Sequence, residues 1–260
     1  MQGLRPRRGS IVALAYHAIA DLRTDPVLAR WSVHPQDFAA QLDAFASSGW
    51  TFVDLDLVLA VQRGERKPPS RALLLTFDDA YTDLLDAALP VLRRHGAPGV
   101  VFAVADQLGG TNSWDQPAGA RPLPLLDASG LREAIARGFE LGSHSTHHRP
   151  LTAVPVGELD GEIAGSAERL LAAGLPRPRS FAYPHGDCDE RIAAAVSAGG
   201  YELAFTIRPG VIAPGSDPFL LPRVAVLGGD TPRSLAVKAA TAAWPERRRI
   251  HAQRLLRIPR

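Results

Sequence analysis

The chain has 260 residues, of which 46% are hydrophobic and 22% charged, so it can form a sizeable core and is not expected to be disordered between its ends. Its formal net charge is only +2, and the basic excess lies in the first eight residues and in 247–260. Nucleic-acid binding by the main body is therefore not expected. The single cysteine, Cys188, excludes an internal disulfide.

Three arginines near the start precede the apolar run 11–15, which resembles the beginning of a secretion signal. The run is short, ends in Tyr16-His17 and lacks a convincing small-residue cleavage site, so we interpret it as a strand. No apolar stretch is long enough to span a bilayer, and we expect a cytoplasmic protein. The basic segment 247–260 could form an amphipathic helix on an anionic membrane, although a solvated tail is the simpler interpretation.

Short β-type runs alternate with helix-type segments along the chain. This alternation is typical of parallel strands linked by crossover helices, and at this length it predicts one large domain. The runs cover residues 11–16, 51–53, 72–77, 99–104, 139–142, 180–183, 201–207 and 221–226.

The helix-type segments between these runs are each followed by a glycine, the residue that commonly ends a helix. They cover residues 35–47, 83–94, 131–137 and 157–173. A further stretch, 109–124, is rich in Gly and Pro and predicts a long loop over one face. Such a loop is a candidate wall for a binding site.

Side chains capable of acid–base or metal chemistry follow four of the runs directly. They are His17, Asp78-Asp79, His144 and His185. Because the carboxyl ends of parallel strands share one rim of a barrel, these side chains are expected to lie close together.

Asp78 and Asp79 are adjacent carboxylates at a strand end, where alternation would turn their side chains in different directions. One could bind a cation while the other transfers a proton. Taken alone, such a pair is more often a polar turn and helix cap.

His144 and His148 lie four residues apart, a spacing that can present two imidazole nitrogens to one ion. One added carboxylate gives a three-ligand set with positions open for water and substrate, which is a catalytic rather than a structural metal arrangement. By itself, three histidines in five residues is also compatible with a solvated loop.

Three segments together resemble the motifs of the polysaccharide deacetylase family, also called the NodB-homology or carbohydrate esterase family 4 domain. Thr-Phe-Asp-Asp at 76–79 resembles its first motif, His-Ser-Thr-His-His at 144–148 its second, and Phe-Ala-Tyr-Pro-His-Gly at 181–186 its third. Their order and separations agree across most of residues 11–226.

This resemblance implies an α/β fold, a distorted (β/α) barrel with about seven parallel strands. It places the deacetylase domain at residues 11–243, between an N-terminal tail (1–10) and a basic C-terminal tail (244–260).

The resemblance also implies a divalent metal ion, usually zinc, held by Asp79, His144 and His148. Asp78 would be the general base that takes a proton from water at the ion, and the backbone N–H of His185 would help to stabilise the tetrahedral oxyanion. The second motif needs only two histidine ligands, so His147 is expected to face solvent or to support the ligands.

Two departures from the family pattern affect the acid and the base. Ala182 stands where many members carry an arginine that orients the catalytic aspartate, and the late Leu-x-x-His motif, whose histidine is a general acid, is absent. Tyr-His-Ala-Ile at 16–19 and Leu-Pro-Arg-Val at 221–224 instead resemble the subgroup of poly-N-acetylglucosamine deacetylases, in which an N-terminal histidine can be the acid. We therefore predict that His17 protonates the leaving amine.

Arg223 is our candidate to replace the missing motif arginine. It lies in a late strand that a parallel barrel could bring beside the strand ending at Asp78, and its planar guanidinium suits a bidentate contact. The alternative is a salt bridge on the outer face.

Aromatic side chains can stack on a sugar ring. Trp114, in the predicted loop, and Tyr183, in the third motif, are the predicted substrate contacts. Trp31 and Tyr81 are weaker candidates, and Trp50 is expected in the core.

The sequence thus predicts a metal-dependent hydrolase that removes the N-acetyl group from N-acetylhexosamine units of a glycan or glycoconjugate and releases acetate. Two alternatives stay open: a carbohydrate O-acetyl esterase that uses the same chemistry, and a catalytically silent carbohydrate-binding protein.

Overall fold

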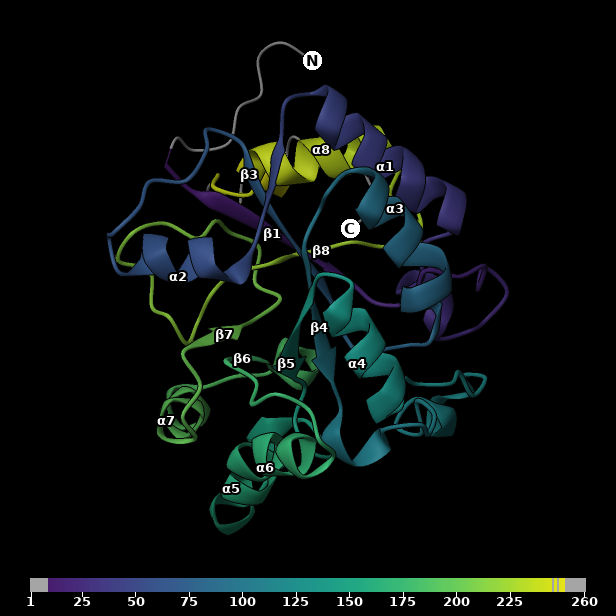
Figure 1. The fold of residues 1–260 in the computed structure, drawn as a ribbon, viewed down its shortest axis with the longest axis vertical. Helices are drawn as coiled ribbons and strands as arrows, with labels where there is room; N and C mark the ends of the chain where they lie inside the picture. Colours follow the sequence, from purple (N-terminus) through teal and green to yellow (C-terminus); the bar gives the residue numbers. More distant parts are fainter. Residues whose placement is uncertain (1–8, 245, 247, 251–260) are drawn as a thin grey trace.

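Eight parallel strands form one curled sheet in the computed structural model, which describes residues 9–244, 246 and 248–250 (Figure 1). Seven of them follow one another in the order β7-β6-β5-β4-β3-β1-β8, and β2 pairs with β3 beside this series. The predicted distorted barrel is confirmed. The strands are β1 (Ile11–Tyr16), β2 (Thr51–Val53), β3 (Ala72–Phe77), β4 (Gly99–Ala103), β5 (Phe139–Ser143), β6 (Ser180–Ala182), β7 (Leu203–Phe205) and β8 (Val224–Ala225).

The last strand segment spans the gap between β7 and β1. Leu221 bridges to Phe205 of β7, and three residues later Val224 pairs with Leu14 of β1. Arg223 lies between these two pairings and is fully buried. The segment that closes the barrel therefore carries this arginine inside it.

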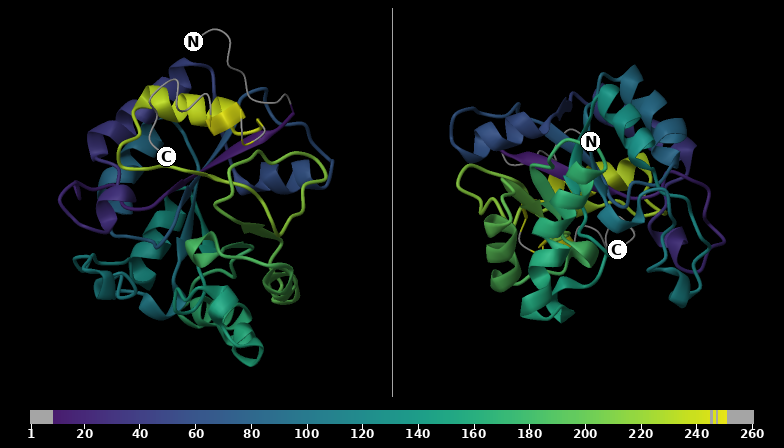
Figure 2. Two further views of the ribbon diagram at one scale, coloured as in Figure 1. Left: turned by 180° about the vertical axis from the view of Figure 1, so that it is seen from behind. Right: turned by 60° about the horizontal axis from the view of Figure 1, so that its bottom comes forward.

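The helices lie around the outside of the sheet (Figures 1 and 2). Several begin at a polar residue whose side chain accepts a hydrogen bond from a backbone N–H of the first turn, as Asp54, Asp127, Asp189 and Thr231 do. The helices are α1 (Pro35–Ser47), α2 (Leu55–Gln62), α3 (Leu89–Arg94), α4 (Ala128–Ala136), α5 (Leu159–Glu162), α6 (Ala164–Ala172), α7 (Glu190–Ala198) and α8 (Pro232–Thr241).

All four predicted helical segments contain helix, but two are less regular than expected. The segment 83–94 begins as a π-helical turn (Leu84–Ala88) before α3. The segment 157–173 is broken at Ile163 (φ −102°, ψ −75°), which separates α5 from α6. The predicted loop 109–124 contains a short 3₁₀ turn (Gln116–Ala118), and its ends are joined by an isolated bridge between Thr111 and Pro124.

The two central strands, β1 and β3, are buried along their whole length. On β3, Leu73, Leu75 and Phe77 join the cluster under the outer helices, whereas Leu74 faces the cluster inside the barrel. This period of two sends the next residues of the inner series, Thr76 and Asp78, into the barrel. The fold thus directs Asp78 towards the closing segment.

Helix α2 closes the end of the barrel where the strands begin. Its buried apolar residues pack with Ile11 and Ala72, the first residues of β1 and β3. The opposite end, where the strands finish, carries the polar side chains.

Two terminal tails and a candidate membrane-contacting segment were also predicted from the sequence. Most of the predicted tails, 1–8 and 251–260, and with them most of the proposed membrane-contacting segment, lie outside the described residues. Among the residues that are described, no helix has the length and apolar character needed to cross a bilayer.

Asp83 is a partly buried carboxylate that connects the chain after β1 to the start of the π-helical turn. Its Oδ1 accepts a hydrogen bond from the Ile19 N–H at 3.0 Å. Burial raises the pKa of Asp83 from 3.8 to about 6, since this hydrogen bond offsets only part of the desolvation.

Because the pKa of Asp83 is higher in the folded state, its ionisation destabilises the fold as the pH rises. Below about pH 4, where Asp83 is protonated in both states, ionisation costs no stability. The free energy of unfolding then falls by about 3 kcal/mol as the pH rises through about 6. Asp83→Asn, which keeps the acceptor oxygen, is expected to remove this pH dependence from the free energy of unfolding measured in urea. Asp160→Asn, at an exposed site, is the control; equal pH dependence in Asp83→Asn and wild type would contradict the prediction.

Candidate functional site

The four strand-end positions predicted from the sequence line a single cavity of about 140 Å³. His17 follows β1, Asp78 and Asp79 follow β3, His144 follows β5 and His185 follows β6. The remaining wall includes Trp31, Tyr81, Trp114, Asp115, His148 and Tyr183.

Asp79, His144 and His148 form a compact group of potential metal ligands, with one ligand atom of each lying within 4.8 Å of the others. Asp79 Oδ1 is 3.5 Å from His144 Nε2 and 3.3 Å from His148 Nε2. This buried oxygen has no hydrogen-bond partner among the described residues, an arrangement that is costly unless another group satisfies it. Two imidazoles and one carboxylate, whose Oδ1 has no hydrogen bond, are a ligand set suited to a divalent cation such as zinc.

His144 is held in the orientation that a metal ligand requires. Its Nδ1 donates a hydrogen bond to the Ala182 carbonyl at 2.7 Å, which leaves the Nε2 lone pair directed towards Asp79. Burial lowers the pKa of His144 to about 4, so the imidazole is neutral at pH 7. A neutral imidazole is the form that binds a metal ion.

The three loops of the site contain every non-glycine residue with a left-handed backbone in the described part of the chain. These residues are Asp79 and Ala80 after β3, Ser145 and His148 after β5, and His185 after β6, with φ between 59° and 71°. Each such conformation costs about 1–3 kcal/mol and persists only where the surroundings enforce it. The fold therefore stores backbone strain at this rim.

Asp78 makes a bidentate ion pair with Arg223 inside the barrel. Arg223 Nη1 and Nη2 donate to Asp78 Oδ1 and Oδ2 at 2.6 and 2.8 Å. The guanidinium is held by Thr76 Oγ1 at 2.9 Å and the Thr206 carbonyl at 3.1 Å. The contact expected from the sequence is thus present, whereas the salt bridge on the outer face is not the arrangement formed.

Two opposing effects set the pKa of Asp78. Burial acts to raise it, but the positive charge of Arg223 and its hydrogen bonds outweigh desolvation and hold the pKa below its usual range. Asp78 is therefore ionised at neutral pH although it is only 3% exposed.

His17 follows the last residue of β1 and also lies near Asp78. Its Nε2 is 4.0 Å from Asp78 Oδ2, and its ring packs against Trp31 with the ring centres 5.0 Å apart. An imidazole and a carboxylate thus line the same cavity. Whether His17 acts as the acid stays a prediction.

The two predicted substrate contacts differ in how they reach the cavity. The Trp114 ring stacks on His148, with centres 4.3 Å apart and planes at 23°. Tyr183 is buried, and its hydroxyl donates to the Phe219 carbonyl at 2.8 Å, so in this arrangement the hydroxyl is already paired. Trp50 packs edge-on against Phe45 in the core, as expected.

His185 contributes both backbone and side chain to the rim. Its ring centre is 4.7 Å from that of His148, and its backbone is left-handed (φ 59°). The role predicted for its N–H stays a prediction.

Asp115 is a cavity residue that the sequence analysis missed. It is partly buried, accepts a hydrogen bond from Asn112 Nδ2 at 3.4 Å, and has its pKa raised by burial and by the charge of Asp79. Its position next to Trp114 in the predicted loop was the available signal. A carboxylate beside an aromatic ring can accept hydrogen bonds from a sugar hydroxyl.

Residues 65–204 match the family model described as polysaccharide deacetylase. A poly-beta-1,6-N-acetyl-D-glucosamine N-deacetylase of Staphylococcus epidermidis is 25% identical over 247 residues, which cover 86% of this chain and 81% of that protein. The solved structure of IcaB from Ammonifex degensii is 25% identical and covers 90% of this chain and 97% of its own, with a TM-score of 0.77. The Streptococcus pyogenes deacetylase PplD, at 21% identity, covers 89% and 99% with a TM-score of 0.75 and supports the fold.

Proposed function

Because the chain belongs to the polysaccharide deacetylase family, we propose that it is a metal-dependent N-deacetylase that removes acetyl groups from N-acetylhexosamine units of a glycan or glycoconjugate. The observation that carries the proposal is the position of the Asp79–His144–His148 group beside the Asp78–Arg223 pair in one cavity. The Staphylococcus epidermidis relative, whose name specifies an N-acetylglucosamine polymer, supports the amide rather than the ester as substrate.

The proposed metal ligands are Asp79, His144 and His148. A divalent ion there, with zinc the expected metal, would act as a Lewis acid on water and on the acetamide oxygen. The neutral imidazole of His144 and the unsatisfied oxygen of Asp79 support this assignment.

Asp78 is the proposed general base. Arg223 keeps it ionised and fixes the plane of its carboxylate, and each of its oxygens still has a lone pair after bonding to the guanidinium. It can therefore take a proton from the attacking water without first rotating. The backbone N–H of His185 is the proposed donor to the developing oxyanion.

His17 is the proposed general acid, which protonates the nitrogen as the C–N bond breaks. An amine is a poor leaving group unless it is protonated, so this step requires a donor on the nitrogen's side of the cavity. Trp114 and Tyr183 are the proposed walls for the sugar ring.

His17→Gln is expected to lower the rate of N-deacetylation by about 10²-fold, because the leaving amine loses its positioned acid. Hydrolysis of an activated aryl acetate should fall much less, since a phenolate leaves without protonation. Both rates would be measured on protein with verified zinc content. Equal losses on both substrates, or a loss of zinc, would assign His17 another role.

Acetate release tests the proposed reaction against its alternatives. The substrates are N-acetylglucosamine, its oligomers, and O-acetylated oligosaccharides of matched length. Release from the N-acetyl series supports the proposal, and release from the O-acetyl series alone would make the protein an esterase. Saccharide binding without release by zinc-loaded protein would identify the silent binding protein.

A further inference from the structure

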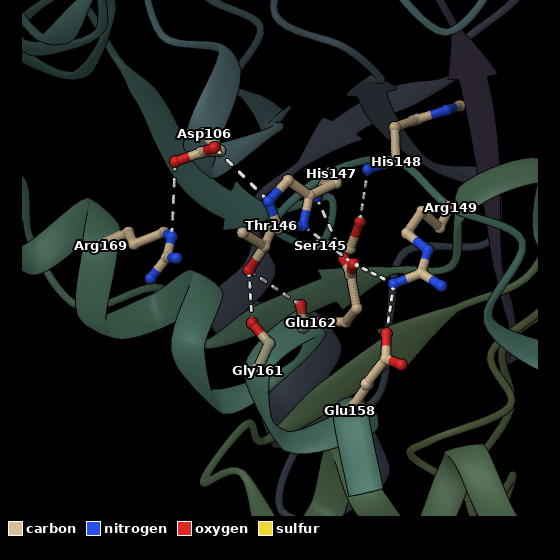
Figure 3. Close-up of polar contacts among 10 residues, drawn as sticks. All are labelled: Asp106, Ser145, Thr146, His147, His148, Arg149, Glu158, Gly161, Glu162 and Arg169. Atoms are coloured by element: carbon tan, nitrogen blue, oxygen red, sulfur yellow. Dashed lines mark hydrogen bonds and ion pairs between the residues drawn. The ribbon is translucent and has the colours of Figure 1, made fainter. Parts of the chain in front are cut away.

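The loop that carries both histidine ligands is anchored by a buried glutamate from outside the cavity. Glu162, at the end of α5, is only 2% exposed. Its Oε2 accepts a hydrogen bond from the His147 backbone N–H at 3.0 Å, and its Oε1 accepts from His147 Nδ1 at 2.9 Å. Figure 3 shows Glu162 beside loop residues 145–149.

The break between α5 and α6 gives the same loop two backbone acceptors. At Ile163 the helix is interrupted, and the Ser166 N–H bonds to the Ile163 carbonyl instead of continuing the α-helical pattern to Glu162. The Glu162 carbonyl instead accepts from the Thr146 N–H at 3.1 Å, and the Gly161 carbonyl from Thr146 Oγ1 at 2.6 Å. The carbonyl groups next to the helix break therefore hold Thr146 of the loop in place.

The loop needs this support because its backbone is strained. Ser145 (φ 67°) and His148 (φ 59°) are left-handed and flank the residues that Glu162 and its neighbours hold. Conformations of this kind, each costing about 1–3 kcal/mol, require compensating contacts. Among the described hydrogen bonds donated by the loop's backbone N–H groups, only the bond to Glu162 has a buried charged group as its acceptor.

We propose that Glu162 is a positioning residue for the metal centre: by binding His147 it fixes the turn between His144 and His148, so that both imidazoles are set before an ion binds. This inference rests on the proposed metal-dependent function. His147 is the connector and not a ligand, since its other nitrogen, Nε2, lies 3.4 Å from Asp106 Oδ2, away from the three-ligand group.

Zinc affinity, measured by competition with a chromogenic chelator, tests the proposal without use of activity. Glu162→Gln keeps the size of the side chain but removes its charge and one of its two acceptors. It is expected to weaken zinc binding about 10- to 100-fold, as loss of a group that orients ligands typically does. Arg149 Nη1 lies 2.7 Å from Glu158 Oε2 and 3.6 Å from Glu162 Oε1. Glu158→Gln is therefore the matched control, because it removes a carboxylate contact of Arg149 and leaves both Glu162–His147 hydrogen bonds in place.

A second readout separates positioning from general stability. In metal-free Glu162→Gln, amide exchange should accelerate in residues 144–149 but not in the strand β5 that precedes them, and kcat should return towards the wild-type value at saturating zinc. If this variant does not fold, His147→Ala removes the Nδ1 contact with Glu162, together with the Nε2 contact with Asp106, but keeps the backbone N–H contact, and it should weaken zinc binding in the same direction. Zinc affinity and loop exchange matching those of Glu158→Gln would overturn the proposal.

The two proposals fail in distinguishable ways. A wild-type protein that binds zinc with an affinity dependent on Glu162, but releases no acetate, would refute the proposed function and leave the role of Glu162 standing. A wild-type protein that binds no zinc would refute both.

Discussion

Asp78→Asn is expected to lower acetate release by about 10²- to 10⁴-fold while the protein keeps close to one zinc ion per chain. The neighbouring substitution, Asp79→Asn, is expected to abolish activity through loss of the ion. The reason is geometric: Asp79 Oδ1 faces two imidazole nitrogens, whereas both oxygens of Asp78 face Arg223. Zinc content and acetate release would be measured on the same samples.

Metal removal provides the control for this pair. Chelation should abolish acetate release by the wild type, and added zinc or cobalt should restore it, whereas Asp78→Asn should stay impaired after reloading. Loss of the ion from Asp78→Asn would exchange the roles of the two aspartates. Full activity of thoroughly demetallated wild type would end the metal-dependent proposal.

Arg223→Lys is expected to reduce turnover strongly although the positive charge is kept, because an ammonium group cannot make the bidentate contact with Asp78. Arg223→Ala is expected to be more severe: leaving a buried carboxylate unpaired typically costs about 3–5 kcal/mol. Urea unfolding and steady-state kinetics would measure the two effects.

The pH dependence of Arg223→Lys gives a sharper test. In the wild type the pKa of Asp78 is held low, so the carboxylate is ionised and stabilising at neutral pH. This stability and the ionised form of the proposed base are lost only as the pH falls through that pKa. Weakening the contact raises the pKa of Asp78, so the acidic limb of kcat/KM should move to higher pH. Arg179→Lys, in a partly exposed pair with Glu140, is the control; a fully active Arg223→Ala would refute the assignment.

The strands and the main site could be predicted because they depend on local patterns. Each predicted β-run contains a strand, since buried parallel strands appear as short apolar runs bounded by turn residues. The polar residues that follow these strands lie at one rim, because all parallel strands have their carboxyl ends at the same edge of the sheet. Arg223 could be placed beside Asp78 for the same reason, once its strand was assigned.

Features without a local pattern were missed. Helix α2 has buried apolar residues on several sides and therefore lacks the one-sided spacing of a surface helix, and α7 and α8 were not assigned. Glu162 contacts His147 across 15 residues, through a helix break at Ile163 that lies between Gly161 and Gly165 but was not predicted. The hydroxyl of Tyr183 is paired with a carbonyl 36 residues later, which its motif does not indicate.

The closure of the barrel at residues 221–225 also determines when the site can first exist during synthesis. Asp78 leaves the ribosome 145 residues before Arg223, the group that keeps its charge stable in the interior. Contacts so distant in sequence form late, because their loop-closure entropy must first be overcome. Until then Asp78 has no counter-charge, and the metal-ligand group beside it faces an open barrel. A chain that ends ahead of residue 221 would therefore lack both the partner of Asp78 and the segment that closes the barrel.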